Sequence, residues 1–396
     1  MFSATCTLSL LALTLPTVFI FFILRKQSKC NISRGRRLTK VSDAYALLNP
    51  PLPLACQLQA RAIANKHLKQ TFKINSTFVD DSVDVHAAFT KKALSLISVR
   101  EVLWNQIAQV ALETVQSNLS HLESNPHHIR FDTFIQRITI RIITVSLLHG
   151  DPSVMHPHDI DTVARNINKL WILSKTTVNI PDTLVGEIND HLRRWLPTSL
   201  KQENPLEYLI PTYETTWRVI AALVAYTYSE NSIRLALHLF LENPSSSQFT
   251  RFCDEHPSTE SIVKETLRLH PPVRRISRAV VIGSSLSQLF CHRTTLAADI
   301  EAIQRSDVWG PTRHEFNPWR HQFSTKEQRK TMLPFGTGPL SCIAKEWAPR
   351  AVAIIAATVL EEVKVHRQFV LVMGPCMGQR EGWDGWTIQL GGTNNM

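Results

Sequence analysis

The stretch Phe335-Gly-Thr-Gly-Pro-Leu-Ser-Cys-Ile-Ala344 is the part of this chain from which its fold can be inferred. It places Gly336 and Gly338 shortly before a single cysteine, Cys342. Glycines let a backbone pass close to a bulky group and adopt conformations that other residues resist. The apolar helix predicted to follow favours negative charge at its start, so we expect a lowered thiol pKa. The stretch predicts a tight loop that offers one thiolate to a large flat ligand; a buried free cysteine beside a turn is the alternative.

This loop resembles the haem-ligand loop of the cytochrome P450 superfamily, whose pattern is Phe-x-x-Gly-x-Arg-x-Cys-x-Gly. Phe335, Gly338 and Cys342 match that pattern. Leu340 replaces the usual arginine, and Ala344 replaces the last glycine. The resemblance implies that Cys342 is the axial ligand of the iron of haem b (iron protoporphyrin IX). It also implies that Phe335 and Gly338 help to form the cofactor site.

The composition fits one large domain or two ordinary ones, because the chain has 396 residues of which 44% are hydrophobic. Its formal net charge is +10, without a basic run of the kind that marks nucleic-acid binding. We therefore expect a membrane surface or an acidic protein as partner, and no nucleic acid. The 7 cysteines include no Cys-x-x-Cys pair, so neither a disulfide framework nor a zinc site is predicted.

The first residues predict a membrane anchor. Residues 5–24 are almost wholly apolar and uncharged, and about 20 such residues are enough to cross a bilayer core. Basic residues follow this segment and none precedes it, which predicts a lumenal N-terminus and a cytoplasmic remainder. We expect a transmembrane anchor over residues 1–24, a basic and proline-rich linker over 25–59 and the catalytic domain over 60–396.

A second motif lies in a long predicted helix that begins at Asn204 and Pro205. Pro211 would remove one helical hydrogen bond, and Glu214 and Thr215 follow it in an otherwise apolar stretch. In the superfamily, an acid and a threonine on the central helix deliver protons during oxygen activation. The resemblance implies this catalytic role for Glu214 and Thr215. The alternative is that Pro211 begins a new helix whose dipole Glu214 complements.

Two downstream segments supply an acid and two arginines. Glu265 and Arg268 precede two prolines that end their predicted helix, and their spacing places them on one helical face. Arg320 follows in Asn-Pro-Trp-Arg, which is similar to the Pro-x-Arg segment of the superfamily. The resemblance implies a buried structural triad of Glu265, Arg268 and Arg320 that supports the haem loop. A guanidinium can pair with a buried carboxylate through two hydrogen bonds.

The sequence shows fewer partners for the haem carboxylates than the superfamily usually has. Arg278 stands where an arginine often binds a haem propionate, and Arg275 is its alternative. Leu340 takes the place of a second donor, and a Trp-x-x-x-Arg motif could map to Trp104, but the fourth residue on is Ala108. Because an unpaired carboxylate in a partly buried site is costly, either Arg278 and a nearby donor compensate or haem is held less tightly.

Together these motifs predict a mainly α-helical haem-thiolate fold with small β-sheets, after an N-terminal transmembrane helix. The resemblance implies a monooxygenase that oxidises an apolar small molecule, in secondary-metabolite (terpenoid or polyketide) biosynthesis of a fungal type. It would use dioxygen and electrons from an NADPH-dependent flavoprotein reductase, and the thiolate would favour O–O cleavage. We expect it at the endoplasmic reticulum membrane, single-pass, with the catalytic domain in the cytoplasm.

Two other functions are open. Superfamily members with such an anchor are usually longer, so the chain could be a membrane-anchored, truncated and inactive pseudoenzyme. It could also bind haem and use it for a rearrangement or a dehydration. Haem content separates the first alternative from the monooxygenase, and dependence of product formation on NADPH and dioxygen separates the second.

Overall fold

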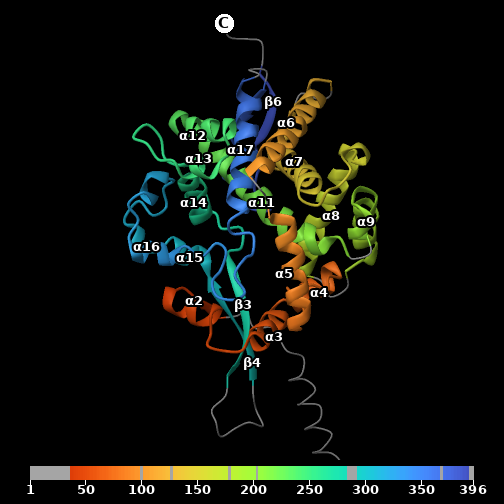
Figure 1. The fold of residues 1–396 in the computed structure, drawn as a ribbon, viewed down its shortest axis with the longest axis vertical. Helices are drawn as coiled ribbons and strands as arrows, with labels where there is room; N and C mark the ends of the chain where they lie inside the picture. Colours follow the sequence, from red (N-terminus) through yellow and green to blue (C-terminus); the bar gives the residue numbers. More distant parts are fainter. Residues whose placement is uncertain are drawn as a thin grey trace, which may run out of the picture.

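The computed structural model describes residues 36–98, 101–124, 128–176, 180–201, 204–282, 292–365 and 369–391. In these residues helices dominate, and two three-stranded sheets complete the fold (Figure 1), which confirms the predicted fold class. The helices are α2 (Val41–Leu48), α3 (Leu54–Ala64), α4 (Lys66–Phe72), α5 (Val83–Ile97), α6 (Glu101–Ser124), α7 (Phe131–Ser146), α8 (Pro157–Thr176), α9 (Asp182–Trp195), α10 (Thr198–Lys201), α11 (Leu206–Thr227), α12 (Asn231–Glu242), α13 (Ser246–Thr250), α14 (Thr259–Leu269), α15 (Ile300–Gln304), α16 (Lys326–Thr331) and α17 (Ala348–Val365). Short 3-10 turns are η1 (Pro152–Val154), η3 (Asp307–Trp309) and η4 (Pro318–His321), and the strands are β1 (Arg36–Leu38), β2 (His128–Arg130), β3 (Arg275–Ile282), β4 (His292–Asp299), β5 (Phe369–Val372) and β6 (Thr387–Leu390).

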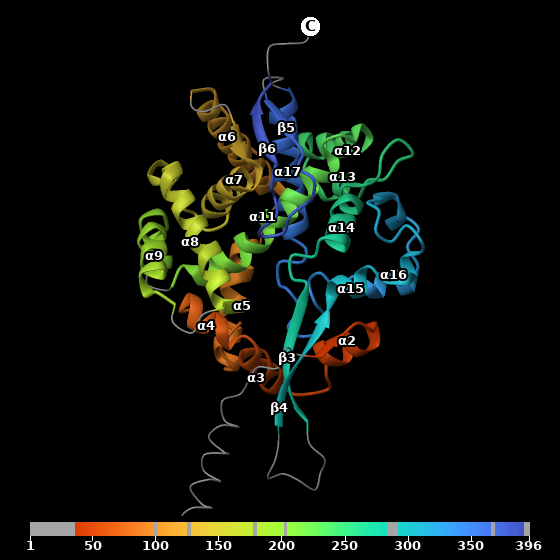
Figure 2. The ribbon, with the colours of Figure 1, turned by 180° about the vertical axis from the view of Figure 1, so that it is seen from behind.

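The main core forms around α11 and α17, which pack against each other at the centre of the helical part (Figure 2). Residues 351–360 of α17 are all buried, as expected of a helix that is apolar on every side. The helices α6 and α7 cover this pair. The core therefore places α17, which directly follows the Cys342 loop, against the helix that carries Glu214.

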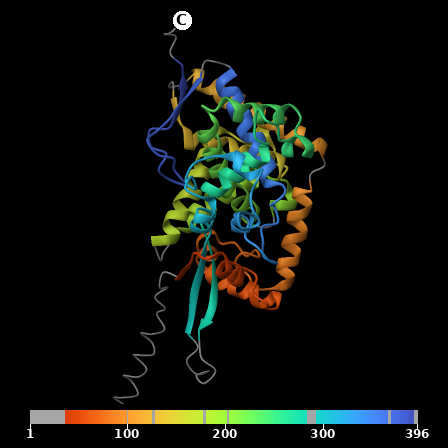
Figure 3. The same ribbon diagram turned by 90° about the vertical axis from the view of Figure 1, so that its left-hand side faces the viewer.

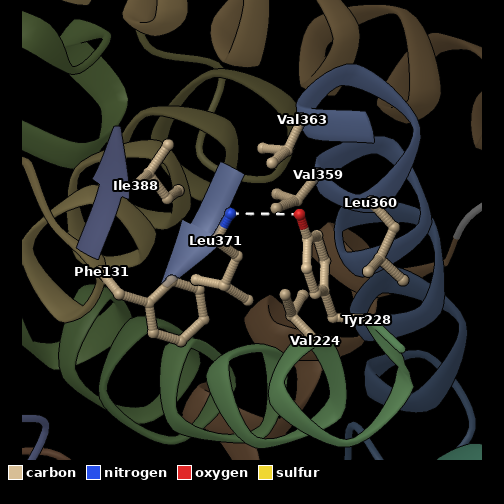
Figure 4. A pocket seen from close by; sticks show the side chains of 8 residues that line it. All are labelled: Phe131, Val224, Tyr228, Val359, Leu360, Val363, Leu371 and Ile388. Atoms are coloured by element: carbon tan, nitrogen blue, oxygen red, sulfur yellow. Dashed lines mark hydrogen bonds between the residues drawn. The ribbon is translucent and has the colours of Figure 1, made fainter. Parts of the chain in front are cut away.

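A C-terminal sheet closes one end of this core. Its order is β2-β6-β5, and both pairings are antiparallel. Val224 of α11, Val359 of α17 and Ile388 of β6 meet in a tightly packed apolar region (Figure 4). At its edge the backbone N–H of Leu371 donates a hydrogen bond to the Tyr228 hydroxyl, 3.2 Å away. Residues 369–391 are thereby attached to the central helices.

A second sheet lies beside the helical part, where β3 and β4 form a long antiparallel ribbon (Figure 3). Strand β1 pairs with β4 in parallel, and α2 packs on the ribbon. Ala44 and Leu48 of α2 form a small second core with Ile300 and neighbouring apolar residues. The predicted linker over residues 25–59 is therefore wrong for residues 36–59, because this stretch pairs and buries side chains as part of the domain.

The predicted anchor over residues 1–24 lies outside the described residues. Among the helices that the structure does describe, none combines the length and the apolar character needed to cross a membrane.

Candidate functional site

The Cys342 loop is a closed turn between α16 and α17. Its φ angles at Gly336 and Gly338 are 68° and 76°, values that side chains other than glycine resist. The backbone N–H of Cys342 donates to the carbonyl of Phe335, 2.8 Å away, and closes the loop. Phe335 packs against the main core. Local hydrogen bonding thus determines the loop shape, and one aromatic side chain anchors it.

Two other elements press against this loop. A Cβ placed on Gly336 would lie 3.4 Å from Cδ1 of Ile276 in β3. A Cβ on Gly338 would lie only 2.8 Å from Cβ of Asn49, which follows α2. Glycine is therefore required at position 338 for both its backbone angle and its lack of a side chain. The loop backbone lies directly against β3 and the end of α2.

Neighbouring protein atoms partly desolvate the Cys342 thiol. The residue has exposed surface, yet protein atoms surround the sulfur closely enough that burial raises the pKa of the thiol, which the hydrogen bond from the Ala344 backbone only partly offsets. The lowered pKa that we predicted is therefore wrong for the protein by itself, because α17 begins only at Ala348 and desolvation outweighs its dipole. A metal ion would reverse this balance, since a coordinating thiol is deprotonated.

Arg278 is one of two buried arginines near the loop. It stands two residues after Ile276 in β3, so both side chains point to the face of the sheet that the loop contacts. Arg278 is 7% exposed, donates from Nη1 to the Ser277 carbonyl at 2.8 Å, and has its pKa lowered to about 10 by burial. Arg275 points to the opposite face, where its exposed Nε lies 3.6 Å from Asp299. Of the two predicted arginines, the geometry favours Arg278.

Arg61 of α3 is the second buried arginine. Helix α3 packs against β3, and Arg61 is also 7% exposed. Its Nη2 donates to the Thr77 carbonyl at 2.7 Å, while its buried Nε has no partner among the described atoms. Burial, followed by the nearby charge of Arg278, lowers the Arg61 pKa to about 10. No described acidic side chain acts on the pKa of either arginine, so the two form a buried cationic site without a counter-charge.

These residues fit haem b. A cysteine thiolate would hold the iron of a haem-thiolate protein, and guanidinium groups suit the two carboxylates of the porphyrin. The buried Nε of Arg61 is a donor that such a carboxylate would satisfy. Of the predicted residues, Cys342 would hold the iron and Arg278 would hold a carboxylate.

The structure brings the predicted triad together. Arg268 binds Glu265 through two hydrogen bonds of 2.8 and 2.9 Å, and Arg320 Nε lies 3.0 Å from Glu265 Oε1. A residue that we did not predict, His321, places Nε2 2.9 Å from Oε2. Burial alone would raise the Glu265 pKa, but the hydrogen bonds from Arg268 and His321 outweigh it and lower the pKa to about 2. This cluster joins α14 to η4.

The helix that carries the second motif is continuous. Helix α11 runs from Leu206 to Thr227 with Pro211 inside it, so the alternative in which Pro211 begins a new helix is wrong. Asn204 Oδ1 accepts a hydrogen bond from the Leu206 backbone at 3.2 Å, close to the predicted helix start. Thr215 donates its hydroxyl to the carbonyl of Pro211, 3.1 Å away.

Glu214 is engaged in a buried ion pair. It is 2% exposed, and its Oε1 accepts a 2.7 Å hydrogen bond from Nε of Arg380. Arg218 Nη2 lies 3.6 Å from the same oxygen, whereas Oε2 is buried without a described partner. Arg380 comes from the segment between β5 and β6 and stacks 4.5 Å from the Trp171 ring centroid. Proton delivery by Glu214 and Thr215 stays a prediction.

The sequence analysis missed four residues of these clusters: His321, Arg61, Arg218 and Arg380. His321 could have been inferred, because it directly follows Arg320. Arg61 and Arg380 had no local signal, since each is one charged residue in an ordinary helix or tail segment. The possible Trp104 motif is a packing site instead, with Trp104 buried 6.4 Å from the ring of Trp347.

Known proteins match parts of the sequence. A model of the family described as Cytochrome P450 matches residues 253–370. The chain is 25% identical over 193 residues to thromboxane-A synthase of Macaca fascicularis, which covers 43% of this chain and 36% of that protein. It is 28% identical over 164 residues to a cytochrome P450 monooxygenase of Gibberella zeae, covering 39% and 37%. The matched segments thus span little more than a third of these curated relatives.

Solved structures match almost the whole chain. The haem domain of a cytochrome P450DA mutant superposes with a TM-score of 0.62 at 15% identity, covering 94% of this chain and 92% of that one. A six-coordinated cytochrome P450 from Thermus thermophilus gives a TM-score of 0.58 at 15% identity, covering 89% and 91%. At these identities the likeness shows the fold, and the family model adds the sequence signature around Glu265 and Cys342. Residues 253–370 therefore match the cytochrome P450 family, and the chain as a whole has the fold of solved cytochrome P450 structures.

Proposed function

We propose that this protein is a haem-thiolate monooxygenase that oxidises an apolar small molecule. The observation that carries the proposal is the placement of Cys342 in a closed loop directly against β3, where Arg278 is buried without an acidic partner. When bound, haem would supply an iron that activates dioxygen, with electron density from the thiolate.

The residues of the chain have distinct tasks in this proposal. Cys342 holds the iron, and the loop backbone keeps its sulfur in place through the hydrogen bond to Phe335. The Glu265 cluster fixes α14 relative to η4 and keeps the segment upstream of the loop rigid. The hydroxyl of Thr215 and the carboxylate of Glu214 are the proton-carrying groups on α11.

The proposed setting includes a membrane and an electron donor. An apolar stretch at residues 5–24 and a net charge of +10 support anchoring at the endoplasmic reticulum membrane. The same charge supports docking of an NADPH-dependent flavoprotein reductase through an acidic face. The matching protein of Gibberella zeae is named a cytochrome P450 monooxygenase, which supports an oxidation of this kind. The proposed substrate is a terpenoid or a polyketide of fungal secondary-metabolite biosynthesis.

The test is the carbon monoxide difference spectrum of the reduced protein. We expect a red-shifted Soret band of the thiolate type in the wild type and its loss in Cys342→Ala. Cys376→Ala, which removes another exposed cysteine, is the matched control and should leave the band unchanged. A folded wild type that takes up no haem would overturn the proposal and support the truncated pseudoenzyme.

The ion pair of Glu214 favours a second candidate, a haem-dependent rearrangement or dehydration. A carboxylate that Arg380 holds at 2.7 Å is less available for delivering protons to oxygen. Such an enzyme would form product without NADPH or dioxygen. Candidate substrates should therefore be incubated with and without each of these; product formation that needs both would reject the second candidate.

A further inference from the structure

Arg61 has a buried hydrogen-bond donor that the described residues leave without a partner. Its Nη2 is used by Thr77, through the backbone carbonyl at 2.7 Å and the side-chain hydroxyl. Its Nε is buried and unpaired, although a buried donor normally has a partner. A second buried cation, Arg278, acts on it from the adjoining strand. Two desolvated like charges without an acid are unfavourable unless an anion joins them.

Polar neighbours hold the Arg61 guanidinium in place. The Thr77 hydroxyl accepts from Arg61 and lies 2.8 Å from Nδ1 of His86 on α5. Burial, and next the charge of Arg61, lowers the His86 pKa and thereby favours the neutral imidazole beside Thr77. The hydrogen bonds that link Arg61, Thr77 and His86 thus leave the Nε edge of the Arg61 guanidinium available to another partner.

We propose that Arg61 binds a carboxylate of haem together with Arg278, and that Thr77 and His86 position it for this contact. Arg61 then takes the place of the donors missing at Leu340 and Ala108. Helix α3 brings it there because α3 packs on β3, whose Ile276 touches the Cys342 loop two residues before Arg278. The inference rests on the proposed function, since it requires that haem binds at Cys342.

The experiment measures the transfer of haem from the full-length holoprotein to an excess of apomyoglobin. We expect Arg61→Leu to accelerate haem loss roughly ten- to a hundredfold, as for the loss of a charge-assisted hydrogen bond. Arg61→Lys should lose haem at a rate between those of the wild type and Arg61→Leu, because lysine keeps the positive charge but lacks the planar guanidinium. Thr77→Val, which removes only the positioning hydroxyl, should accelerate haem loss a few-fold.

Reconstitution with haem dimethyl ester identifies the atoms involved. Esterification removes the carboxylate charge, so the wild type and Arg61→Leu should lose the ester at nearly equal rates. The apoprotein of Arg61→Leu should be at least as heat-stable as the wild-type apoprotein, because a buried unpaired charge has been removed.

A matched control comes from Arg141 on α7. It is also partly buried, donates to a backbone carbonyl (Met155, 2.9 Å) and has its pKa lowered by burial. Arg141→Leu should reduce stability without faster haem loss. The proposal is overturned if Arg61→Leu retains haem like the wild type, or if it accelerates the loss of haem and its dimethyl ester equally.

Failure of the underlying function would look different. In that case the wild type would bind no haem, and Cys342→Ala would be indistinguishable from it. Failure of the Arg61 assignment alone would leave a wild-type holoprotein whose spectrum depends on Cys342 but whose rate of haem loss is independent of Arg61.

Discussion

Arg380 and Glu214 are 166 residues apart in the chain, yet Nε of Arg380 lies 2.7 Å from Oε1 of Glu214. The side chains are 15% and 3% exposed, so the pair is almost wholly inside the protein. Arg380 also stacks on Trp171 of α8. The contact attaches the segment between β5 and β6 to the central helix α11.

Arg380→Leu is expected to destabilise the protein by about 3–5 kcal/mol, because Glu214 would remain buried with only Arg218 nearby, 3.6 Å away. The double variant Glu214→Leu/Arg380→Leu should recover most of this loss, since no buried charge is left unpaired. The free energies of unfolding of the wild type, the single variant and the double variant can be measured by urea unfolding. A double variant as unstable as the single one would contradict this account of the pair.

Glu265→Gln is expected to remove stability and to change its pH dependence. The pKa of Glu265 falls from 4.5 to about 2 on folding. A carboxyl with a depressed pKa stabilises the fold above its unfolded pKa, and this stability is lost as the pH falls from about 4.5 to about 2. The shift corresponds to about 3 kcal/mol.

Urea unfolding at stepped pH checks this expectation. Glu265→Gln should show a weaker loss of stability in that window than the wild type. Glu260→Gln is the control, because Glu260 on the same helix forms only an exposed pair with Lys264. Equal acid sensitivity of Glu265→Gln and the wild type would disprove the assignment.

Gly338→Ala is expected to distort the haem loop. Its φ of 76° costs an alanine about 1–2 kcal/mol, and the new Cβ would meet Asn49 at 2.8 Å. Gly382→Ala is the control for a positive φ without a clash, because its φ is 88° and the new Cβ would have only an ordinary contact, 3.6 Å from Cα of Gly378. The free energy of unfolding and the retention of haem should therefore both fall further in Gly338→Ala than in the control variant. Adding Asn49→Gly to Gly338→Ala should restore the additional stability that the clash removes. Equal losses of stability in the two glycine variants would refute the clash.

His270 is expected to make the protein sensitive to mild acid. Burial, followed by the charges of Arg305 and Arg274, lowers its pKa from 6.5 to about 4. The unfolded chain then binds the proton more readily, so stability falls by about 3 kcal/mol between pH 6.5 and about 4. His270→Gln should flatten the stability profile in that window. A profile that keeps the wild-type slope there would exclude His270 as its source.

Local sequence patterns were sufficient to predict individual helices and turns and the motif that each of them carries. The glycines before Cys342 indicated a tight turn because positive φ is a property of single residues. The continuous apolar character of residues 351–360 indicated a buried helix before its neighbours were known. The start of α11 near Asn204 was also indicated locally, although Pro205 and not Asn204 is its N-cap residue.

By itself, then, the sequence determined the secondary structure near each motif and the tight turn before Cys342, because these depend on neighbouring residues. Only the tertiary structure decided that the charge of Arg278 acts on Arg61, that Arg380 binds Glu214, and that the pKa of Cys342 is raised. Each of these properties depends on which segments, distant in the sequence, pack against each other and exclude water. Desolvation and ion pairing are set by packing across the fold, and no local pattern around a single charged residue or thiol records them.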